Sequence, residues 1–305
     1  MKMIEYILCH GSGNRFVLLD AVKHDLTAIQ TAEFVQKTCQ CNAADGVLFL
    51  TQDPSGLYAM RMFNTDGSEA EMCGNGIRCV ARLVSQRYIS ESSYTMISGS
   101  NRYPITHEQP IAEGVETYSV EIGIATHSAD FTLTESRFVG KSIEALDPSL
   151  YFTYLNLGNP HIVAMCDNID LDHLTTLGER VKRLTMIFPK GVNVSLIKYL
   201  GEQQIFVATY ERGVGLTPSC GTAMTASCTA ATLLGVCREQ RVVEVRNRGG
   251  MVYCTTKLQP SLTTKLTGNA TFDSIGHLAE DGQIIDLTPI DSEREAWAKF
   301  TDSLK

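Results

Sequence analysis

The alternation of apolar and polar residues predicts a series of strands and helices in the first part of the chain. Strands are typical of period-two runs, and helices of apolar residues three and four positions apart. The predicted elements are strands within residues 4–20 on either side of a Gly-containing turn, a helix over 26–35, strands over 46–51 and 57–63, a helix over 74–86 and a strand over 118–122.

The second part of the chain repeats this order. Its predicted elements are strands over 154–157 and 161–165, a helix over 171–181, strands over 191–197 and 204–210, a helix over 221–234, and strands over 242–245, 251–255 and 266–272. The acidic segment from His277 onward, with an amphipathic piece at 296–300, is interpreted as a surface extension. The shared order indicates an internal duplication.

A chain of 305 residues is long enough for two domains, each with its own core. The repeated pattern places one domain at residues 1–124 plus 269–305 and the other at 125–268. The formal charge of −8 argues against a nucleic-acid or anionic-membrane partner, because either surface requires a basic patch.

No apolar run approaches the roughly 20 residues of a membrane helix, and Glu5 and His10 interrupt the first apolar stretch, so we expect a cytoplasmic protein. The 10 cysteines show no CxxC spacing, which favours reduced thiols over disulfides or a metal centre. We therefore predict no metal. A homodimer stays an open alternative.

Two cysteines stand at matching places in the two halves. Cys73 and Cys220 each follow a polar, Gly-containing loop and precede a predicted helix. A thiol at a helix N-terminus is close to unpaired N–H groups and to the positive end of the helix dipole, so we expect the pKa of each to fall below its free value of about 8.5. Two such thiols suggest acid/base catalysis in which one removes a proton from a carbon and the other delivers one.

The residues around these cysteines resemble a known family. The segment from Phe63 to Cys79, Phe-Asn-Thr-Asp-Gly-Ser-Glu-Ala-Glu-Met-Cys-Gly-Asn-Gly-Ile-Arg-Cys, is similar to the signature of diaminopimelate epimerases. Four further motifs follow in the family's order, at residues 10–16, 158–161, 191–194 and 210–215. The resemblance implies an α/β fold with mixed sheets, in two pseudo-symmetric domains. Each domain is a curved sheet or barrel around a central helix, and the active site lies in the cleft between them.

The same resemblance implies an isomerase that interconverts LL- and meso-2,6-diaminopimelate, a precursor of lysine and peptidoglycan, without a cofactor. It implies that Cys73 and Cys220 are the acid/base thiols, assisted by His161 and Glu211. Gly74, Asn75, Gly221 and Thr222 become the donors for the substrate α-carboxylate at two helix N-termini, where such groups bind anions. The remaining substrate-binding residues implied for the distal amino-acid group are Asn14, Asn64, Asn159, Asn193 and Arg212. We expect the Arg212 guanidinium to be buried.

Three positions depart from the family's usual pattern. Leu216 replaces a carboxylate before the second cysteine, Met224 adds bulk to the first turn of the following helix, and Arg15 replaces the Asp that commonly follows the opening Asn. These changes leave the thiols intact and keep a racemase of another amino acid, such as histidine, as an alternative. From other classes, a cysteine hydrolase and a non-catalytic amino-acid-binding protein also stay open.

Overall fold

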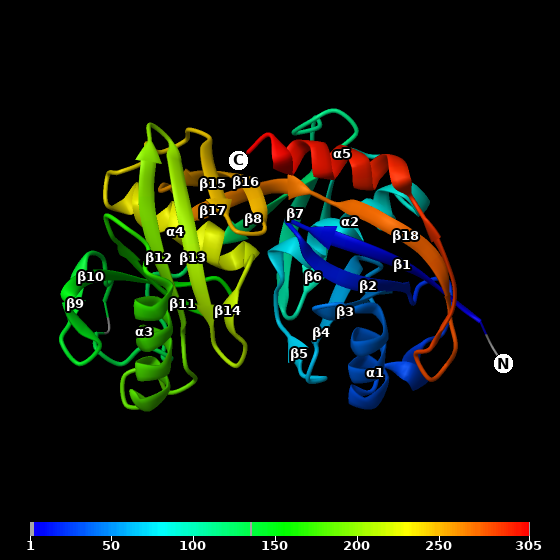
Figure 1. Ribbon diagram of the computed structural model, residues 1–305, viewed down its shortest axis with the longest axis horizontal. Helices are drawn as coiled ribbons and strands as arrows, with labels where there is room; N and C mark the ends of the chain where they lie inside the picture. The colour runs from blue at the N-terminus through cyan, green and yellow to red at the C-terminus, as the bar shows by residue number, and fades with distance from the viewer. Residues whose placement is uncertain (1–2, 135, 305) are drawn as a thin grey trace. The chain divides into compact units, whose positions relative to one another are not determined.

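The chain folds into two compact units, seen in the computed structural model, which describes residues 3–134 and 136–304 (Figure 1). Unit 1 comprises Met1–Val120 and Thr267–Lys305, and unit 2 comprises Glu121–Leu266. The chain passes between the units within β8 (Thr117–Gly123) and returns within β17 (Thr263–Asn269).

Unit 1 is built on a mixed sheet in which β1 pairs with β2 and β18 on its two sides. Its other strands pair in the order β2–β3–β4–β6–β7–β8, with β5 beside β4 and β19 beside β18. The elements are β1 (Ile4–Gly11), β2 (Asn14–Asp20), the short 3-10 helix η1 (Thr27–Ile29), α1 (Ala32–Asn42), β3 (Gly46–Gln52), β4 (Tyr58–Asn64), β5 (Glu69–Ala70), α2 (Gly74–Arg87), β6 (Ser93–Ser98), β7 (Asn101–His107), β18 (Thr271–Leu278), β19 (Ile284–Pro289) and α5 (Asp291–Asp302).

Unit 2 has a second mixed sheet, in the order β9–β10–β11–β12–β13–β15–β16, with β14 also beside β13. Its elements are β9 (Lys141–Ile143), β10 (Asp147–Asn156), β11 (Pro160–Met165), α3 (Leu171–Arg183), β12 (Asn193–Gly201), β13 (Gln204–Glu211), β14 (Gly215–Thr217), α4 (Gly221–Leu233), β15 (Val243–Asn247) and β16 (Gly250–Lys257).

The two units share one topology. In unit 1 an antiparallel pair, β1–β2, leads through α1 to the parallel pair β2–β3 and then to the antiparallel pairs β3–β4 and β4–β5. In unit 2 the same senses recur in β10–β11, β11–β12, β12–β13 and β13–β14, with α3 in the place of α1. The helices that begin at the two cysteines follow at equivalent positions, α2 after β5 and α4 after β14. The internal duplication predicted from the sequence is therefore visible in the pairing itself.

Each sheet curves around the helix that a cysteine begins. Helix α2 contacts β1 to β4 and also β7, and α4 contacts β10 to β13 as well as β15 and β16. All residues from Gly74 to Val84 of α2 and from Gly221 to Thr232 of α4 are buried. A helix hidden on every side is surrounded by its sheet rather than packed on one face of it. The predicted fold class, mixed sheets each around a central helix, is confirmed.

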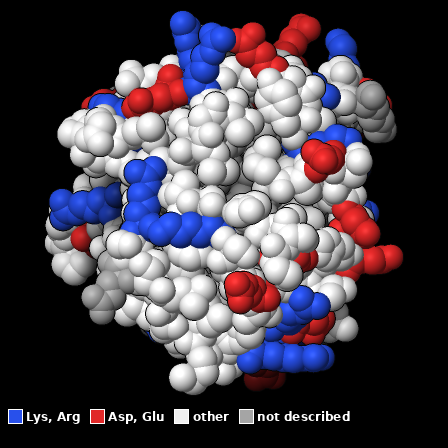
Figure 2. Space-filling model, turned by 90° about the vertical axis from the view of Figure 1, so that its left-hand side faces the viewer, with Lys and Arg blue, Asp and Glu red and all other residues white. Residues whose placement is uncertain are grey.

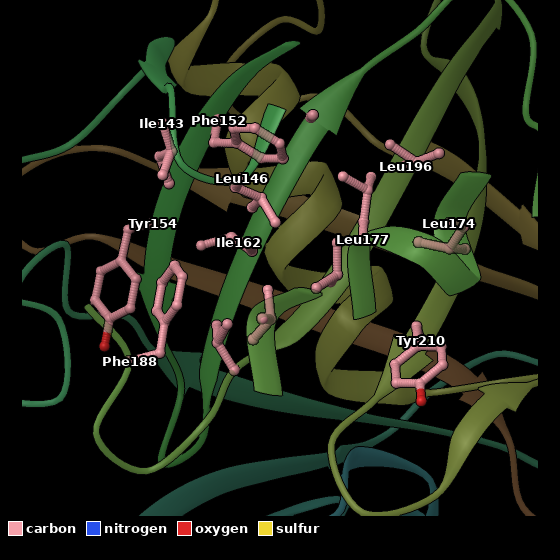
Figure 3. Packing of buried hydrophobic residues seen from close by; sticks show 14 of the residues in the cluster. Ile143, Leu146, Phe152, Tyr154, Ile162, Leu174, Leu177, Phe188, Leu196 and Tyr210 are labelled. Carbon is pink, nitrogen blue, oxygen red and sulfur yellow. The ribbon is translucent and has the colours of Figure 1, made fainter. Parts of the chain in front are cut away.

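The outer helices cover the other side of each sheet. In unit 2, α3 presents Leu174 and Leu177 to a buried cluster that includes Phe152, Ile162 and Tyr210 (Figure 3). In unit 1, α1 buries its apolar residues against a corresponding cluster on β1, β2 and β3. Apolar side chains of this kind contribute about 1.5–3 kcal/mol each when fully buried.

Two sequence predictions need correction. The helix expected over 26–35 begins instead at Ala32, because Thr31 is extended and its side chain accepts the Phe34 N–H. The strand expected over 266–272 is divided at Ala270 into β17 and β18. The C-terminal segment belongs to unit 1 and lies at its surface: β19 pairs with β18 and is exposed along its length, and Phe300 is the buried residue of α5.

In the described ranges no helix is long and apolar enough to cross a membrane. Figure 2 shows one face of the molecule, where several Lys and Arg side chains gather on the left and reach toward the centre, and many of the Asp and Glu side chains lie along the top and the right-hand edge.

Candidate active site

Cys73 occupies the N-cap position of α2 in unit 1. Its backbone is extended, with φ −139° and ψ 109°, and its Sγ accepts the backbone N–H of Gly76 at 3.3 Å. The sulfur thus performs the role that a Ser or Thr oxygen usually has at a helix start. A side chain at Gly76 would meet Leu48 at 2.8 Å, so glycine lets the first turn approach the sheet. The first N–H groups of α2, on Gly74 and Asn75, have no partner within the helix by geometry.

A network of amides and a buried guanidinium holds this helix start in place. Arg78 is fully buried and donates to the Gly74 carbonyl at 2.7 Å and to the Asn75 Oδ1 at 3.1 Å. The Asn75 amide in turn donates to Asn14 Oδ1 at 3.5 Å. Sequence reasoning did not assign Arg78 a role. Arginines at 78 and 82, within the apolar run Ile77–Val84 of this helix, were the signal that could have found it.

Asn64 ends β4 and pairs with Gly46 on β3, next to Asp45. Its side-chain amide donates to Ser68 Oγ at 3.0 Å, which closes the turn before β5. Asn14 donates to Asp45 Oδ2 at 2.8 Å. In unit 1 the structure therefore brings Asn14, Asn75 and the start of α2 together and gives Asn64 a turn contact.

Cys220 begins α4 in unit 2 with the same extended backbone, φ −132° and ψ 111°. Its sulfur is buried and lies 3.5 Å from the Thr222 hydroxyl. The Thr222 oxygen accepts the Asn159 amide at 3.1 Å, so its own hydroxyl proton is available for the sulfur. Gly221 and Thr222 form the first turn, as the sequence predicts.

His161 extends this chain of hydrogen bonds. Its Nε2 is 3.0 Å from Asn159 Oδ1, and because the Asn159 amide nitrogen already donates to Thr222, the imidazole donates here. Its Nδ1 is then a bare acceptor, buried and without a hydrogen-bond partner among the described residues. Burial, and next the charge of Arg212, lower the pKa of His161 to about 3. The imidazole is neutral at physiological pH.

The expectation of a lowered thiol pKa is wrong for Cys220. Burial raises its pKa well above the ordinary value, and the negative charge of Glu211 raises it further. Hydrogen bonds from Thr222 and from the Ala223 N–H act in the opposite direction and are outweighed. The helix N-terminus therefore does not overcome desolvation and a neighbouring carboxylate. Cys220 is a protonated thiol at neutral pH.

Asn193 and Arg212 lie next to these groups on the sheet. Asn193 begins β12, pairs with His161 on β11, and accepts the backbone N–H of Arg212 at 2.9 Å. The Arg212 guanidinium donates to the Lys190 carbonyl at 2.9 Å. The side chain is exposed, so the expectation that it is buried is wrong. It comes directly after the last residue of β13.

Met224 and Leu216, the two departures from the usual family pattern near Cys220, differ in burial. Met224 is buried, and its sulfur lies 2.9 Å from the Asn247 amide and 4.0 Å from Ser219 Oγ. Leu216 pairs with Tyr210 across β13 and β14 and is 40% exposed. Met224 is thus part of the packing of α4, and Leu216 is an accessible apolar side chain near the site.

The repeated topology makes Asn64 and Glu211 equivalent. Each is the last residue of the strand before the hairpin, and Cys73 follows Asn64 by the same number of residues as Cys220 follows Glu211. The carboxylate is present only in unit 2. The two thiols therefore have similar backbones and different neighbours.

No group of three or more His, Cys, Asp or Glu side chains in residues 3–134 and 136–304 is arranged to hold a metal ion. Unit 1 offers a thiol at a helix N-terminus, and unit 2 offers a thiol at a helix N-terminus, a neutral imidazole and a carboxylate. These groups suit proton transfer and carboxylate binding.

Solved structures of other proteins, each less than 20% identical to this chain, have a similar fold. A hydroxyproline epimerase from Agrobacterium vitis, crystallised with bound trans-4-hydroxy-L-proline, has a similar structure with a TM-score of 0.61 and 13% identity, covering 100% of this chain and 99% of that one. A phenazine biosynthesis protein of the PhzF family from Bacillus anthracis is similar with a TM-score of 0.65 and 16% identity, covering 92% of this chain and all of that one.

The sequence comparisons identify the family. The diaminopimelate epimerase family model matches residues 6–117 and 153–272. The diaminopimelate epimerase of Clostridium acetobutylicum is 33% identical over 310 residues, covering 98% of this chain and 92% of the relative. That of Enterococcus faecalis is 37% identical, covering 91% and 89%. The chain belongs to the diaminopimelate epimerase family, and it is an isomerase of the epimerase type.

Proposed function

We propose that this enzyme interconverts LL- and meso-2,6-diaminopimelate by two-thiol proton transfer at one α-carbon, which would place it in the formation of lysine and peptidoglycan precursors. The observation that carries the proposal is the pair of cysteines at the N-caps of two equivalent helices in a member of this family. The reaction requires one group on each face of the α-carbon, so both units contribute to it.

Proton transfer proceeds with one thiolate and one thiol. The thiolate removes the α-proton and becomes a thiol, the electron pair left on carbon is delocalised into the α-carboxylate, and the other thiol protonates the opposite face and becomes the thiolate. The raised pKa of Cys220 supports a role as the proton donor in the first direction. In the reverse direction Cys220 must lose its proton, and Glu211 is the neighbouring base that assists.

The α-carboxylate would be held at the two helix starts. Gly74 and Asn75 in unit 1, and Gly221 and Thr222 in unit 2, present backbone N–H groups that have no partner within their helices. Such donors stabilise negative charge as it develops on a carboxylate. The fixed position of Asn75, which donates to Asn14 and accepts from Arg78, supports preorganisation of one of these helix starts.

The distal end of the substrate would be bound by Arg212 with the four asparagines at positions 14, 64, 159 and 193. A guanidinium can hold a carboxylate by two parallel hydrogen bonds. A racemase of a simple amino acid has no second carboxylate for Arg212 to bind, and this favours diaminopimelate. Leu216 is the observation that favours an amino acid with an apolar or imidazole side chain instead, since it is accessible and replaces a carboxylate of the family pattern.

The experiment is deuterium incorporation at the substrate α-carbon in deuterated buffer. LL-diaminopimelate, meso-diaminopimelate and histidine are each incubated with the native enzyme and with Cys73→Ala and Cys220→Ala. We expect incorporation with the two diaminopimelates, and at least about a 100-fold loss of complete epimerisation in either variant. Cys41→Ala is the matched control, because Cys41 is an exposed thiol far along the chain from both motifs.

Two results would contradict the proposal in different ways. Full turnover in either cysteine variant would exclude the two-thiol mechanism. Faster exchange with histidine than with LL-diaminopimelate would leave the mechanism intact and show that the substrate is wrong.

A further inference from the structure

A cavity of about 390 Å³ lies in unit 1, and Cys73 is not one of its lining residues. It is lined by the β1–β2 hairpin on one side and by β18, β19 and α5 on the other, and Arg15, Asp273, Arg294 and Trp297 are among its lining residues. Successive residues of a strand point to opposite faces. Arg15 therefore points away from the face on which Asn14 reaches Asn75.

Two guanidinium groups face this cavity with few partners of their own. The Arg15 side chain makes no hydrogen bond or ion pair with any described residue. Arg294 is at the rim, where its only such contact in the described ranges is with the exposed Asp291 at 3.4 Å. Arginine forks are suited to carboxylates and related anions. Arg15 is also a departure from the family's usual Asp, so this cation is a feature of the present chain.

His10 also lines the cavity and provides a third hydrogen-bond donor. Its Nδ1 accepts hydrogen bonds from the Asn269 amide at 3.1 Å and from the Gly13 N–H at 3.4 Å. The ring proton is therefore on Nε2. The side chain is only 6% exposed, and Nε2 lies 3.8 Å from Asp273 Oδ1, beyond hydrogen-bond distance. This N–H makes no hydrogen bond to a described residue and lines the cavity.

The charges around the cavity leave a positive excess. Burial, with the charges of Arg15 and Arg78, lowers the pKa of His10 to about 4, so the imidazole is neutral at pH 7. Burial raises the pKa of Asp273, against the opposing effect of Arg15 and Arg294. Glu293 is also near Asp273, but Arg82 binds both of its oxygens, at 2.5 and 2.6 Å. The two lining arginines therefore face at most one lining carboxylate.

The rest of the cavity is apolar. Trp297 of α5 lies against His10, with ring centroids 5.1 Å apart, and Leu287 and Pro289 of β19 complete this wall. Small-molecule sites are concave, mostly apolar, 300–1,000 Å³ in volume, and contain a few convergent polar groups. The volume of this cavity lies in that range, and its lining combines apolar side chains with polar and charged ones.

We propose that this cavity is a second binding site, for a small organic carboxylate. Arg15, Arg294 and the His10 Nε2–H hold the anionic group, and the apolar part of the ligand packs against Trp297 and Leu287. The site is contained in unit 1, and the proposal does not depend on the identity of the epimerase substrate.

The test uses the fluorescence of Trp297, which is the single tryptophan of the chain. The full-length enzyme is titrated with hexanoate, with uncharged hexanamide and with inorganic phosphate. We expect saturable change with hexanoate at a Kd in the millimolar range or below, and none with hexanamide. Phosphate distinguishes a general anion site from a carboxylate site, and tighter binding of phosphate than of hexanoate would overturn the assignment.

Variants separate binding from a change in structure. Arg15→Gln and Arg294→Gln should each weaken hexanoate binding about tenfold or more, and Lys299→Gln, which removes a charge on α5 outside the cavity, should not change it. Asp273→Asn removes the carboxylate that competes for the guanidinium groups and should strengthen binding, which a merely damaged cavity would not do. Three results would each refute the site. The first is that the two arginine variants bind hexanoate as tightly as Lys299→Gln does. The others are weaker binding by Asp273→Asn and no fluorescence response of the native enzyme to hexanoate.

Discussion

Replacing Gly178 with alanine sets two opposing effects against each other. Gly178 lies in the middle of α3, where alanine normally stabilises a helix by about 0.8–1 kcal/mol. At this position, however, the added Cβ would stand 2.2 Å from Tyr210 Cδ1 and 2.3 Å from Cγ. Carbon atoms in contact are normally about 3.5–4.0 Å apart.

The Tyr210 ring has little freedom to move away. It is 5% exposed and belongs to the buried cluster of unit 2, and its hydroxyl donates to Glu179 on the same helix (Figure 3). Overpacking of a core costs about 1–3 kcal/mol. Because the added Cβ meets the ring atoms closest to the backbone, we take the upper value of this range, about 3 kcal/mol, for the cost of overpacking. Subtracting the gain of about 1 kcal/mol in helix propensity leaves a net destabilisation of about 2 kcal/mol.

Urea unfolding followed by far-ultraviolet circular dichroism measures this difference. Gly178→Ala should lower the midpoint, and in the Tyr210→Leu background the same substitution should be neutral or stabilising, because the ring that it meets is gone. Activity should also fall, since Tyr210 directly precedes Glu211 on β13. A Gly178→Ala protein more stable than the native one by about 1 kcal/mol would show that helix propensity decides and that the packing argument is wrong.

Three further predictions concern charge. Because the pKa of His161 is lowered to about 3 in the folded protein, its contribution to stability is fully present above about pH 6.5. It should decline by about 1.4 kcal/mol per pH unit as the pH falls from 6.5 toward 3, and His161→Gln should reduce this slope in urea unfolding at pH 7, 6 and 5. Glu293→Gln should destabilise unit 1 by about 3–5 kcal/mol in thermal unfolding, because it leaves the buried guanidinium of Arg82 without its anion. The control is Asp291→Asn, which breaks an exposed ion pair and should cost less than about 1 kcal/mol in the same measurement. Arg212→Met should lower kcat/KM for LL-diaminopimelate, mainly by raising KM, and the loss of transition-state stabilisation should be about 1–3 kcal/mol. An unchanged KM would mean that Arg212 does not bind the distal end of the substrate.

The elements that the sequence predicts well are those with an unbroken apolar pattern. The central strands, for example β3 and β4, and the cysteine-headed helices α2 and α4 were predicted close to their bounds, because burial imposes a continuous apolar run there. The strands β6 and β7 were missed, since Ser93–Ser98 and Asn101–His107 have few buried apolar residues. The two strands pair with each other as a hairpin, with β4 beside β6 and β8 beside β7, and the pattern of apolar residues does not report this pairing.

The residue types of the candidate site were visible in the sequence, but their electrostatics were not. The helix N-terminus suggested a low thiol pKa for Cys220, and the structure gives the opposite, because burial and Glu211 act more strongly than the helix. The exposure of Arg212 could not be foreseen either, since it depends on what covers the residue after β13. Both quantities are properties of the environment in three dimensions rather than of the motif.

The duplicated topology gives the difference between the two thiols a physical meaning. A proton transfer in both directions requires each thiol to be acid in one direction and base in the other, so two identical environments would serve as well as two different ones. Unit 2 places a carboxylate, Glu211, at the strand end where unit 1 has the neutral Asn64. The carboxylate favours the protonated form of Cys220, and by accepting a proton it can also assist that thiol in becoming a base.

Exchanging the two residues, Glu211→Asn with Asn64→Glu, should therefore transfer the preference for the protonated form from Cys220 to Cys73. Measured as the pH dependence of alkylation by iodoacetamide at each cysteine, Cys220 should react at lower pH and Cys73 at higher pH than in the native enzyme. Unchanged profiles would mean that burial alone sets the difference.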